Sequence, residues 1–265
     1  MSIFVLVHGS CHGGWCWRKL THLLCKSGHE VYTPTLTGLG ERSHVLTKDI
    51  GLDTHIKDIF QVMDYEDLNN VILVGHSYGG LVIGGVAEKI PHRIKHLVYL
   101  DGYIPEDGKS AFELVPGLRD IYEKRSMKEQ GKAWLVPPYD ATAWGVTNQR
   151  DIAWMDTRLC PMPWHTHDQP SEIQNIESRN LPKTYIACTD FKDFHFMARR
   201  AKSYAWEYYS LKTGHDAMVT LPNELASLLQ RVSDIQSEQY LLRPFSKTSD
   251  YEKEIFTCPF WFEIN

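Results

Sequence analysis

A serine flanked by glycines gives the clearest chemical signal in this chain. Residues 71–74 form a short apolar run typical of a buried strand, residues 81–90 are typical of a helix, and Ser77 lies between them in a Gly-His-Ser-Tyr-Gly turn. A turn this tight holds the serine in a strained backbone conformation and leaves no room for side chains at 75 and 79. The pattern alone also fits an ordinary strand-to-helix turn. A nucleophilic role for Ser77 therefore depends on what the rest of the chain can supply.

A serine hydroxyl is a weak nucleophile and needs a base to take its proton. The chain has 13 histidines, and His215 lies on a glycine-containing loop that follows the last predicted strand. From such a loop an imidazole reaches the carboxyl edge of a parallel sheet, where the serine turn also lies. We predict that His215 is the base, because its place in the chain, after the nucleophile and the last strand, fits that role.

The base in turn needs an acid that fixes its tautomer and stabilises its cation. Asp101 directly follows the strand that comes after the serine turn, 24 residues beyond Ser77. Asp190 and Asp193 follow the next core strand, which is the more common location for this acid, but they also fit plain helix caps. We favour Asp101 because it ends its strand directly, and Asp190 and Asp193 stay as alternatives.

Two backbone N–H groups are predicted to bind the oxyanion that forms when a serine attacks a carbonyl carbon. One belongs to Tyr78, at the head of the helix after the serine, and the other belongs to Ser10, in a glycine-rich loop after the first strand. Fixed donors of this kind stabilise negative charge where it develops. His76, beside the nucleophile, is expected to point away from the site and to serve packing.

Strand-like and helix-like segments alternate along most of the chain. The predicted strands are 3–7, 30–36, 71–74, 94–100, 182–188 and 206–211, and the predicted helices are 15–27, 52–63, 81–90, 193–202 and 222–233. This alternation predicts an α/β fold with a mostly parallel central sheet and helices on both of its faces.

The alternation stops between residues 104 and 180. Helical periods occur near 110–130 and 148–159, no strand period is evident, and four tryptophans lie here, namely Trp134, Trp144, Trp154 and Trp164. An insertion of this size between core strands predicts a helical cap over the site, with about half of the tryptophans lining an apolar pocket. We therefore predict a single domain, 1–235, with a core of 1–103 and 181–235, a cap of 104–180, and a C-terminal tail of 236–265.

Composition and motifs limit the other classes of function. The 265-residue chain has a net charge of −5 and a pI near 6.2, which gives no basic surface for nucleic acid. No apolar run approaches the ~20 residues that span a bilayer, and the N-terminus does not resemble a signal peptide. The six cysteines form no C-x-x-C pair, so we expect free thiols in a cytoplasmic protein. The glycine-rich loops match neither G-x-G-x-x-G nor a P-loop, and we expect no cofactor or metal.

Four segments resemble one branch of the α/β-hydrolases. Residues 4–17 and 74–80 closely resemble plant methylesterases and hydroxynitrile lyases, and residues 35–42 and 214–218 are similar to their bacterial esterase relatives. The resemblance implies an α/β-hydrolase fold with Ser77 as nucleophile, His215 as base, and the N–H groups of Ser10 and Tyr78 as the oxyanion hole. The plant members carry their acid after the later strand and lack an aspartate at the position of Asp101, which leaves the acid open.

The sequence therefore predicts a serine carboxylesterase that hydrolyses small apolar alkyl or aryl esters through an acyl-enzyme. One alternative is a hydroxynitrile-lyase-type acid–base enzyme. The lyases place a lysine directly after the histidine, whereas this chain has Asp216, whose charge is expected to repel cyanide. Another alternative is a non-catalytic receptor for a small molecule, which would need none of this chemistry. A homodimer formed through the cap tryptophans and the tail is also compatible with the sequence.

Overall fold

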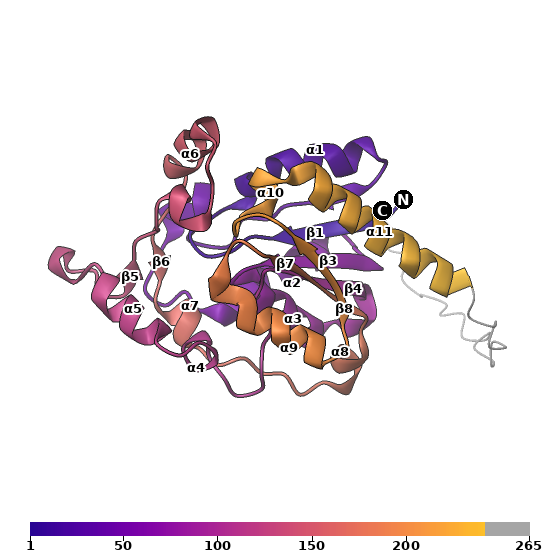
Figure 1. Cartoon of the computed structure of the whole chain (residues 1–265). Helices are drawn as coiled ribbons and strands as arrows, with labels where there is room; N and C mark the ends of the chain where they lie inside the picture. Colours follow the sequence, from indigo (N-terminus) through magenta and orange to yellow (C-terminus); the bar gives the residue numbers. More distant parts are fainter. Residues whose placement is uncertain (242–265) are drawn as a thin grey trace, which may run out of the picture.

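The protein is built on one parallel β-sheet. The computed structural model describes residues 1–241, and within them six strands run parallel in the order β2-β1-β3-β4-β7-β8 (Figure 1). The predicted α/β class with a mostly parallel sheet is confirmed. The strands are β1 (Ile3–Val7), β2 (Glu30–Tyr32), β3 (Val71–His76), β4 (Ile94–Leu100), β7 (Lys183–Cys188) and β8 (Glu207–Leu211).

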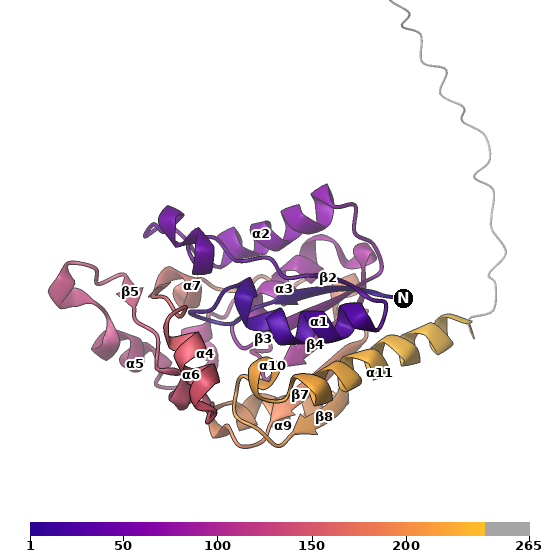
Figure 2. The same cartoon turned by 90° about the horizontal axis from the view of Figure 1, so that it is seen from above.

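Helices cover both faces of this sheet. Figure 2 shows α2 and α3 on one side of the strands and α1 and α11 on the opposite side. Side chains of α9 join the core beneath α2 and α3, and those of α10 join the core beneath α1 and α11. These helices are α1 (Arg18–Lys26), α2 (Leu52–Tyr65), α3 (Gly79–Lys89), α9 (His195–Ser203), α10 (Ala217–Thr220) and α11 (Pro222–Leu241).

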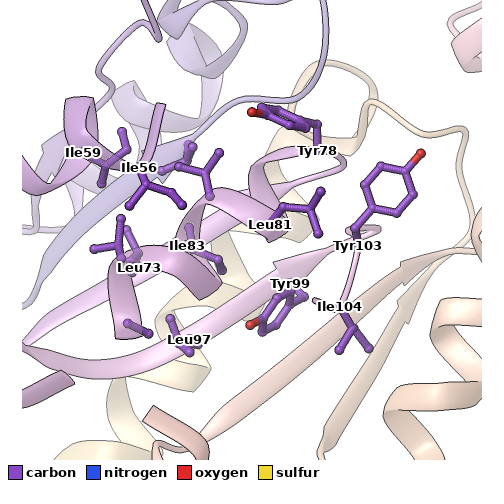
Figure 3. Close-up of a cluster of buried hydrophobic side chains, with 14 of the residues drawn as sticks. Ile56, Ile59, Leu73, Tyr78, Leu81, Ile83, Leu97, Tyr99, Tyr103 and Ile104 are labelled. Atoms are coloured by element: carbon purple, nitrogen blue, oxygen red, sulfur yellow. The ribbon is translucent and has the colours of Figure 1, made fainter. Parts of the chain in front are cut away.

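Side chains of the central strands alternate between the two cores. Leu73 and Leu97 pack with Ile56 of α2 in the cluster drawn in Figure 3, whereas Ile72 and Val74 belong to the core on the other face. A strand that is buried on both faces is apolar at every position, which explains why residues 71–74 form a continuous apolar run. The serine turn that follows β3 is consequently anchored in tightly packed structure on both sides.

The segment between β4 and β7 lies beyond the carboxyl ends of the strands (Figure 1). The sequence shows no strand period here, yet besides helices the segment contains β5 and β6, which pair in an antiparallel ladder of two residues each. Strands so short show no alternation in a sequence. The elements of this inserted segment are α4 (Ala111–Leu114), α5 (Leu118–Arg125), β5 (Leu135–Val136), α6 (Gln149–Asp156), β6 (Met162–Pro163), α7 (His165–Asp168) and α8 (Ile176–Asn180).

Some predicted boundaries differ from the structure. β2 ends at Tyr32 rather than at residue 36, because Pro34 has no N–H to donate to a strand ladder. α11 continues to Leu241 instead of ending near 233, so the predicted tail begins as helix, and its residues 242–265 lie outside the described part of the chain. No helix among residues 1–241 is long and apolar enough to cross a bilayer.

Glycines at 75 and 79 make the turn after β3 possible. A Cβ on Gly75 would lie 2.5 Å from the carbonyl oxygen of Gly79, and a Cβ on Gly79 would lie 2.6 Å from the carbonyl oxygen of Val7. Both neighbours are backbone atoms in a close-packed interior, so neither can move aside easily. The absence of these side chains lets the start of α3 lie directly against the end of β1.

We expect Gly75→Ala to lower the free energy of unfolding by more than about 3 kcal/mol, above the usual cost of overpacking, because the new methyl group meets backbone. Gly28→Ala is the control: Gly28 has a φ of 81° and open space at its Cβ position, so only left-handed strain of about 1 kcal/mol is expected. Urea denaturation measures both losses. Equal losses would mean that the turn relaxes around the methyl group.

Candidate active site

Ser77 lies directly after β3, and its backbone is held on both sides. Its N–H donates to the Leu100 carbonyl at 3.2 Å, and its own carbonyl accepts from the Tyr103 N–H at 3.0 Å. Its φ of 52° is uncommon for a residue other than glycine, and these contacts maintain it. The residue is 8% exposed and lines a cavity. The turn therefore presents a hydroxyl to the cavity from an otherwise buried backbone.

His215 and Asp101 form a buried hydrogen-bonded pair. Nδ1 of His215 lies 2.7 Å from Oδ2 of Asp101, and each residue is 1% exposed. The second carboxylate oxygen accepts from the Cys188 N–H at the end of β7, at 3.2 Å. Because an ionised carboxylate only accepts, Nδ1 of His215 carries the proton and the lone pair of Nε2 is left to take one from a nucleophile.

Nε2 of His215 has no hydrogen-bond partner among the described residues, Ser77 included. Catalytic hydrogen bonds often close only when a substrate is bound. The imidazole is enclosed by other rings, whose centroids lie between 4.5 and 5.6 Å from its own: His76, Trp144, Phe191 and Phe194. The backbone N–H of His215 donates to the Trp144 carbonyl at 2.8 Å, and this bond connects the loop that carries His215 to the inserted segment.

The other two candidate acids lie elsewhere. Asp190 and Asp193 are exposed, and within the described residues neither carboxylate pairs with His215, whose ion-pair partner is Asp101. Asp193 instead lines the cavity. The geometry therefore favours Asp101 as the acid.

The backbone N–H groups of Ser10 and Tyr78 are available for a ligand. Neither donates a hydrogen bond to another described residue, and the Ser10 loop is close to the nucleophile, since a Cβ on Gly9 would lie 2.8 Å from Ser77 Cβ. The Tyr78 side chain lies within the buried cluster of Figure 3, where its hydroxyl donates to His55 Nδ1 at 2.9 Å. Tyr78 thus leaves only its backbone to the site.

A cavity of about 440 Å³ extends from Ser77 into the inserted segment. Most of its wall is aromatic or aliphatic. Its polar side chains are fewer than its apolar ones, and besides Ser77 they include Ser10, Arg125, His167 and Asp193. A cavity of this size and composition suits a small, largely apolar molecule with a few polar atoms.

His167, in the inserted segment, places a neutral imidazole against the loop that carries Ser10. The Thr166 hydroxyl donates to the Pro163 carbonyl, so His167 Nδ1 donates to the Thr166 oxygen and Nε2 accepts from the Ser10 hydroxyl at 3.2 Å. Burial, with a smaller effect from His55, lowers the pKa of His167 to about 3. The side chain of Ser10 is therefore fixed by the inserted segment, while its N–H stays unpaired.

A model of the alpha/beta hydrolase family matches residues 4–228. The chain belongs to this family. Its curated relatives include a carbendazim hydrolyzing esterase of Nocardioides sp., which is 38% identical over 240 residues, 86% of this chain and 98% of the relative. Salicylic acid-binding protein 2 of Nicotiana tabacum is 38% identical over 210 residues, 71% of this chain and 79% of the relative. The predicted place among the esterases of the plant methylesterase branch is confirmed.

Solved structures of the family share the fold. An extracellular alpha/beta-hydrolase from a Paenibacillus species has a TM-score of 0.77 at 23% identity, over 87% of this chain and 98% of its own. A tomato methylketone synthase I has a TM-score of 0.76 at 20% identity, over 89% of this chain and 98% of its own. Esterases among the curated relatives support an ester hydrolase.

Sequence reasoning missed much of the cavity wall of this hydrolase. Phe191 and Phe194 follow β7 and contact His215, but only the aspartates of that loop were considered as site residues. Their position after the carboxyl end of a core strand was the available signal. Conversely, only Trp144 of the four inserted tryptophans lines this cavity, whereas Trp154, for example, packs on Trp15.

Asp216 does not face the substrate space. Its side chain is fully buried, its Oδ2 lies 3.4 Å from His12 Nε2, and it does not line the cavity. The expectation that its charge repels cyanide therefore gains no support from a direct contact with the cavity and stays a prediction. His76, expected to pack away from the site, donates from Nε2 to the His215 carbonyl at 3.1 Å and so supports the loop that carries His215.

Among residues 1–241, no cluster of three or more His, Cys, Asp or Glu could hold a metal ion.

Asp101→Asn is expected to lower kcat by about 10³- to 10⁴-fold, because an amide in place of the carboxylate favours the wrong His215 tautomer. Asp190→Asn, in the exposed loop after β7 and outside the cavity lining, is the control and should change kcat by less than about threefold. Steady-state kinetics on a chromogenic ester measures both. A larger loss in Asp190→Asn than in Asp101→Asn would assign the acid to the loop after β7.

Proposed function

We propose that this hydrolase is a serine carboxylesterase acting on small, largely apolar alkyl or aryl esters. The observation that carries the proposal is the buried 2.7 Å hydrogen bond between His215 and Asp101, beside a serine that opens on an apolar cavity. A base oriented in this way has its free nitrogen ready for the proton of a serine. The esterase names of the curated relatives support the same class of substrate.

In the proposed reaction, Ser77 Oγ attacks the ester carbonyl carbon and its proton passes to His215 Nε2, while Asp101 stabilises the imidazolium. The carbonyl oxygen becomes an oxyanion and accepts hydrogen bonds from the N–H groups of Ser10 and Tyr78. Collapse of this intermediate breaks the bond to the alcohol, which leaves with the proton from Nε2. Water then repeats the sequence on the acyl-enzyme, releases the acid and restores Ser77.

The cavity supports a neutral substrate with an aromatic or short alkyl group. Trp144, Phe191 and Phe194 lie beside the base and offer flat apolar surfaces to an aryl ring. Aromatic faces and apolar walls make it costly to bury a charge that finds no partner. The volume of about 440 Å³ suits a compact molecule rather than a polymer.

We expect the purified protein to hydrolyse p-nitrophenyl acetate and butyrate, and Ser77→Ala to lower kcat by at least about 10³-fold because the acyl-enzyme can no longer form. A fluorophosphonate probe should label the wild-type protein and not Ser77→Ala. Turnover no higher than that of Ser77→Ala would overturn the esterase proposal. Cleavage of mandelonitrile would then indicate a lyase, and tight binding of a small molecule without turnover would indicate a receptor.

A further inference from the structure

A second group of ionisable side chains lies behind the base, away from the cavity. Asp216 directly follows His215, and the rings of His12 and His76 approach its carboxylate. Asp216 is fully buried, and the two histidines are 2% and 1% exposed. None of the three lines the cavity that contains Ser77. The proposed reaction uses none of them directly.

His12 carries a proton on both ring nitrogens. Its Nδ1 lies 2.7 Å from the Ser10 carbonyl oxygen, which can only accept, so Nδ1 is protonated. Its Nε2 lies 3.4 Å from Oδ2 of Asp216, and an ionised carboxylate requires a proton there as well. Burial by itself lowers the pKa of His12, but the charge of the adjacent Asp216 and the hydrogen bond to the Ser10 carbonyl raise it above its ordinary value. The two contacts of the ring thus favour an imidazolium.

Asp216 depends on this cation. Neither of its carboxylate oxygens accepts a hydrogen bond with good geometry from any described residue. A buried carboxylate with no counter-charge is costly. Burial by itself raises the pKa of Asp216, but the attraction of His12, followed by that of His76 and His215, lowers it below its ordinary value. The carboxylate thus stays ionised because His12 is protonated.

His76 does not supply the counter-charge. Its Nε2 lies 3.6 Å from Asp216 Oδ1, but that nitrogen already donates to the His215 carbonyl at 3.1 Å. Its Nδ1 has no partner within the described residues. Burial, together with the nearby His215, lowers the pKa of His76 well below its ordinary value. A neutral His76 leaves His12 as the cation that pairs with Asp216.

His12 and Asp216 lie on the two loops that carry the Ser10 N–H and His215, two groups that the proposed reaction uses together. His12 closes the loop that carries the Ser10 N–H, where its own N–H approaches the Gly9 carbonyl at 3.4 Å and Cys11 has a φ of 66°. Asp216 belongs to the loop that carries His215. A shift of either loop changes the distance between the oxyanion donor and the base, and a misplacement of about 1 Å can cost about 100-fold in rate.

We propose that His12 and Asp216 form a buried ion pair that positions the Ser10 N–H relative to His215, an inference that rests on the proposed ester hydrolysis. Both are positioning residues, because neither contacts the reacting atoms. A buried ion pair adds little net stability, since the loss of hydration offsets the attraction. Its effect here is geometric: the charges attract only when the two loops are correctly placed.

The ion pair depends on pH through His12. Because the pKa of His12 in the folded protein lies above the ordinary value of 6.5, the pair is complete below that pH and is lost as the pH rises through the raised pKa. The ionisable groups that face the pair are His8, Cys16, His76, Cys188 and His215. Burial lowers the pKa of His8 and His76, so both are neutral in this range. Burial raises the pKa of the Cys16 and Cys188 thiols, so these stay protonated.

Two substitutions each remove one charge of the pair. Asp216→Asn removes the anion with little change in shape, and His12→Gln removes the cation. We expect each to lower kcat for p-nitrophenyl butyrate by about 10- to 100-fold, with KM changed by less than about threefold. The double variant should lose no more than the worse single variant, because the two residues act as a unit. The wild-type kcat/KM should fall at alkaline pH as the pair is lost, and Asp216→Asn, which has no pair to lose, should lack this fall.

His96→Gln is the matched control. His96 is also a buried histidine, at 1% exposed, but its Nε2 contacts the Thr184 hydroxyl at 2.8 Å between β4 and β7, and the proposed reaction does not use it. It should lower Tm and leave kcat and the pH profile unchanged. Wild-type kcat and an unchanged alkaline fall in Asp216→Asn, or losses that multiply in the double variant, would overturn the inference.

A measurement on the intact wild-type protein does not require the variants to fold. Two-bond ¹H–¹⁵N NMR should show both ring nitrogens of His12 protonated at neutral pH, and a neutral His12 ring would overturn the ion pair. This result does not depend on ester hydrolysis. A wild-type protein that hydrolyses no ester but has a doubly protonated His12 would therefore overturn the proposed function and not the ion pair.

Discussion

The site depends on one backbone constraint, the left-handed conformation of Ser77. A residue with a side chain holds a φ of 52° only where the surrounding structure leaves it no alternative. Here β1 and α3 approach the turn so closely that two glycines are required in it. The same close packing brings the loop after β1, which carries Gly9 and Ser10, against Ser77. The position of the hydroxyl and that of the Ser10 N–H are thus consequences of a single packing arrangement.

His215, the proposed base, has two buried carboxylates close to it, and they have different partners. Asp101 bonds directly to His215 Nδ1, so its charge acts on that imidazole. Asp216 lies beside His12, which neutralises it locally. Two uncompensated anions in a low-dielectric interior would repel each other and strongly favour a protonated base. With Asp216 beside His12, Asp101 is the carboxylate that bonds to the imidazole of His215.

The sequence alone was sufficient to predict the sheet and the place of the nucleophile turn, because both depend on local apolar runs and on glycine spacing. It also favoured Asp101, since a residue directly after a strand has a defined position at the sheet edge. The cavity wall could not be predicted in the same way. β5 and β6 are too short to show a period, and His12 and Asp216 are brought together only by the complete fold. Contacts between distant loops leave no pattern in either loop.

The hydrogen bond between His215 and Asp101, the residue directly after β4, has a consequence for which parts of the site can change. Because Asp101, and not a residue after β7, pairs with His215, Phe191 and Phe194 of the loop after β7 are left to face the cavity. Side chains of that loop and of the inserted segment that line the cavity without touching His215, such as Val136, can therefore be exchanged while the Asp101–His215 hydrogen bond stays intact. The shape of the substrate space is in this way separable from the pairing of the two reactive side chains.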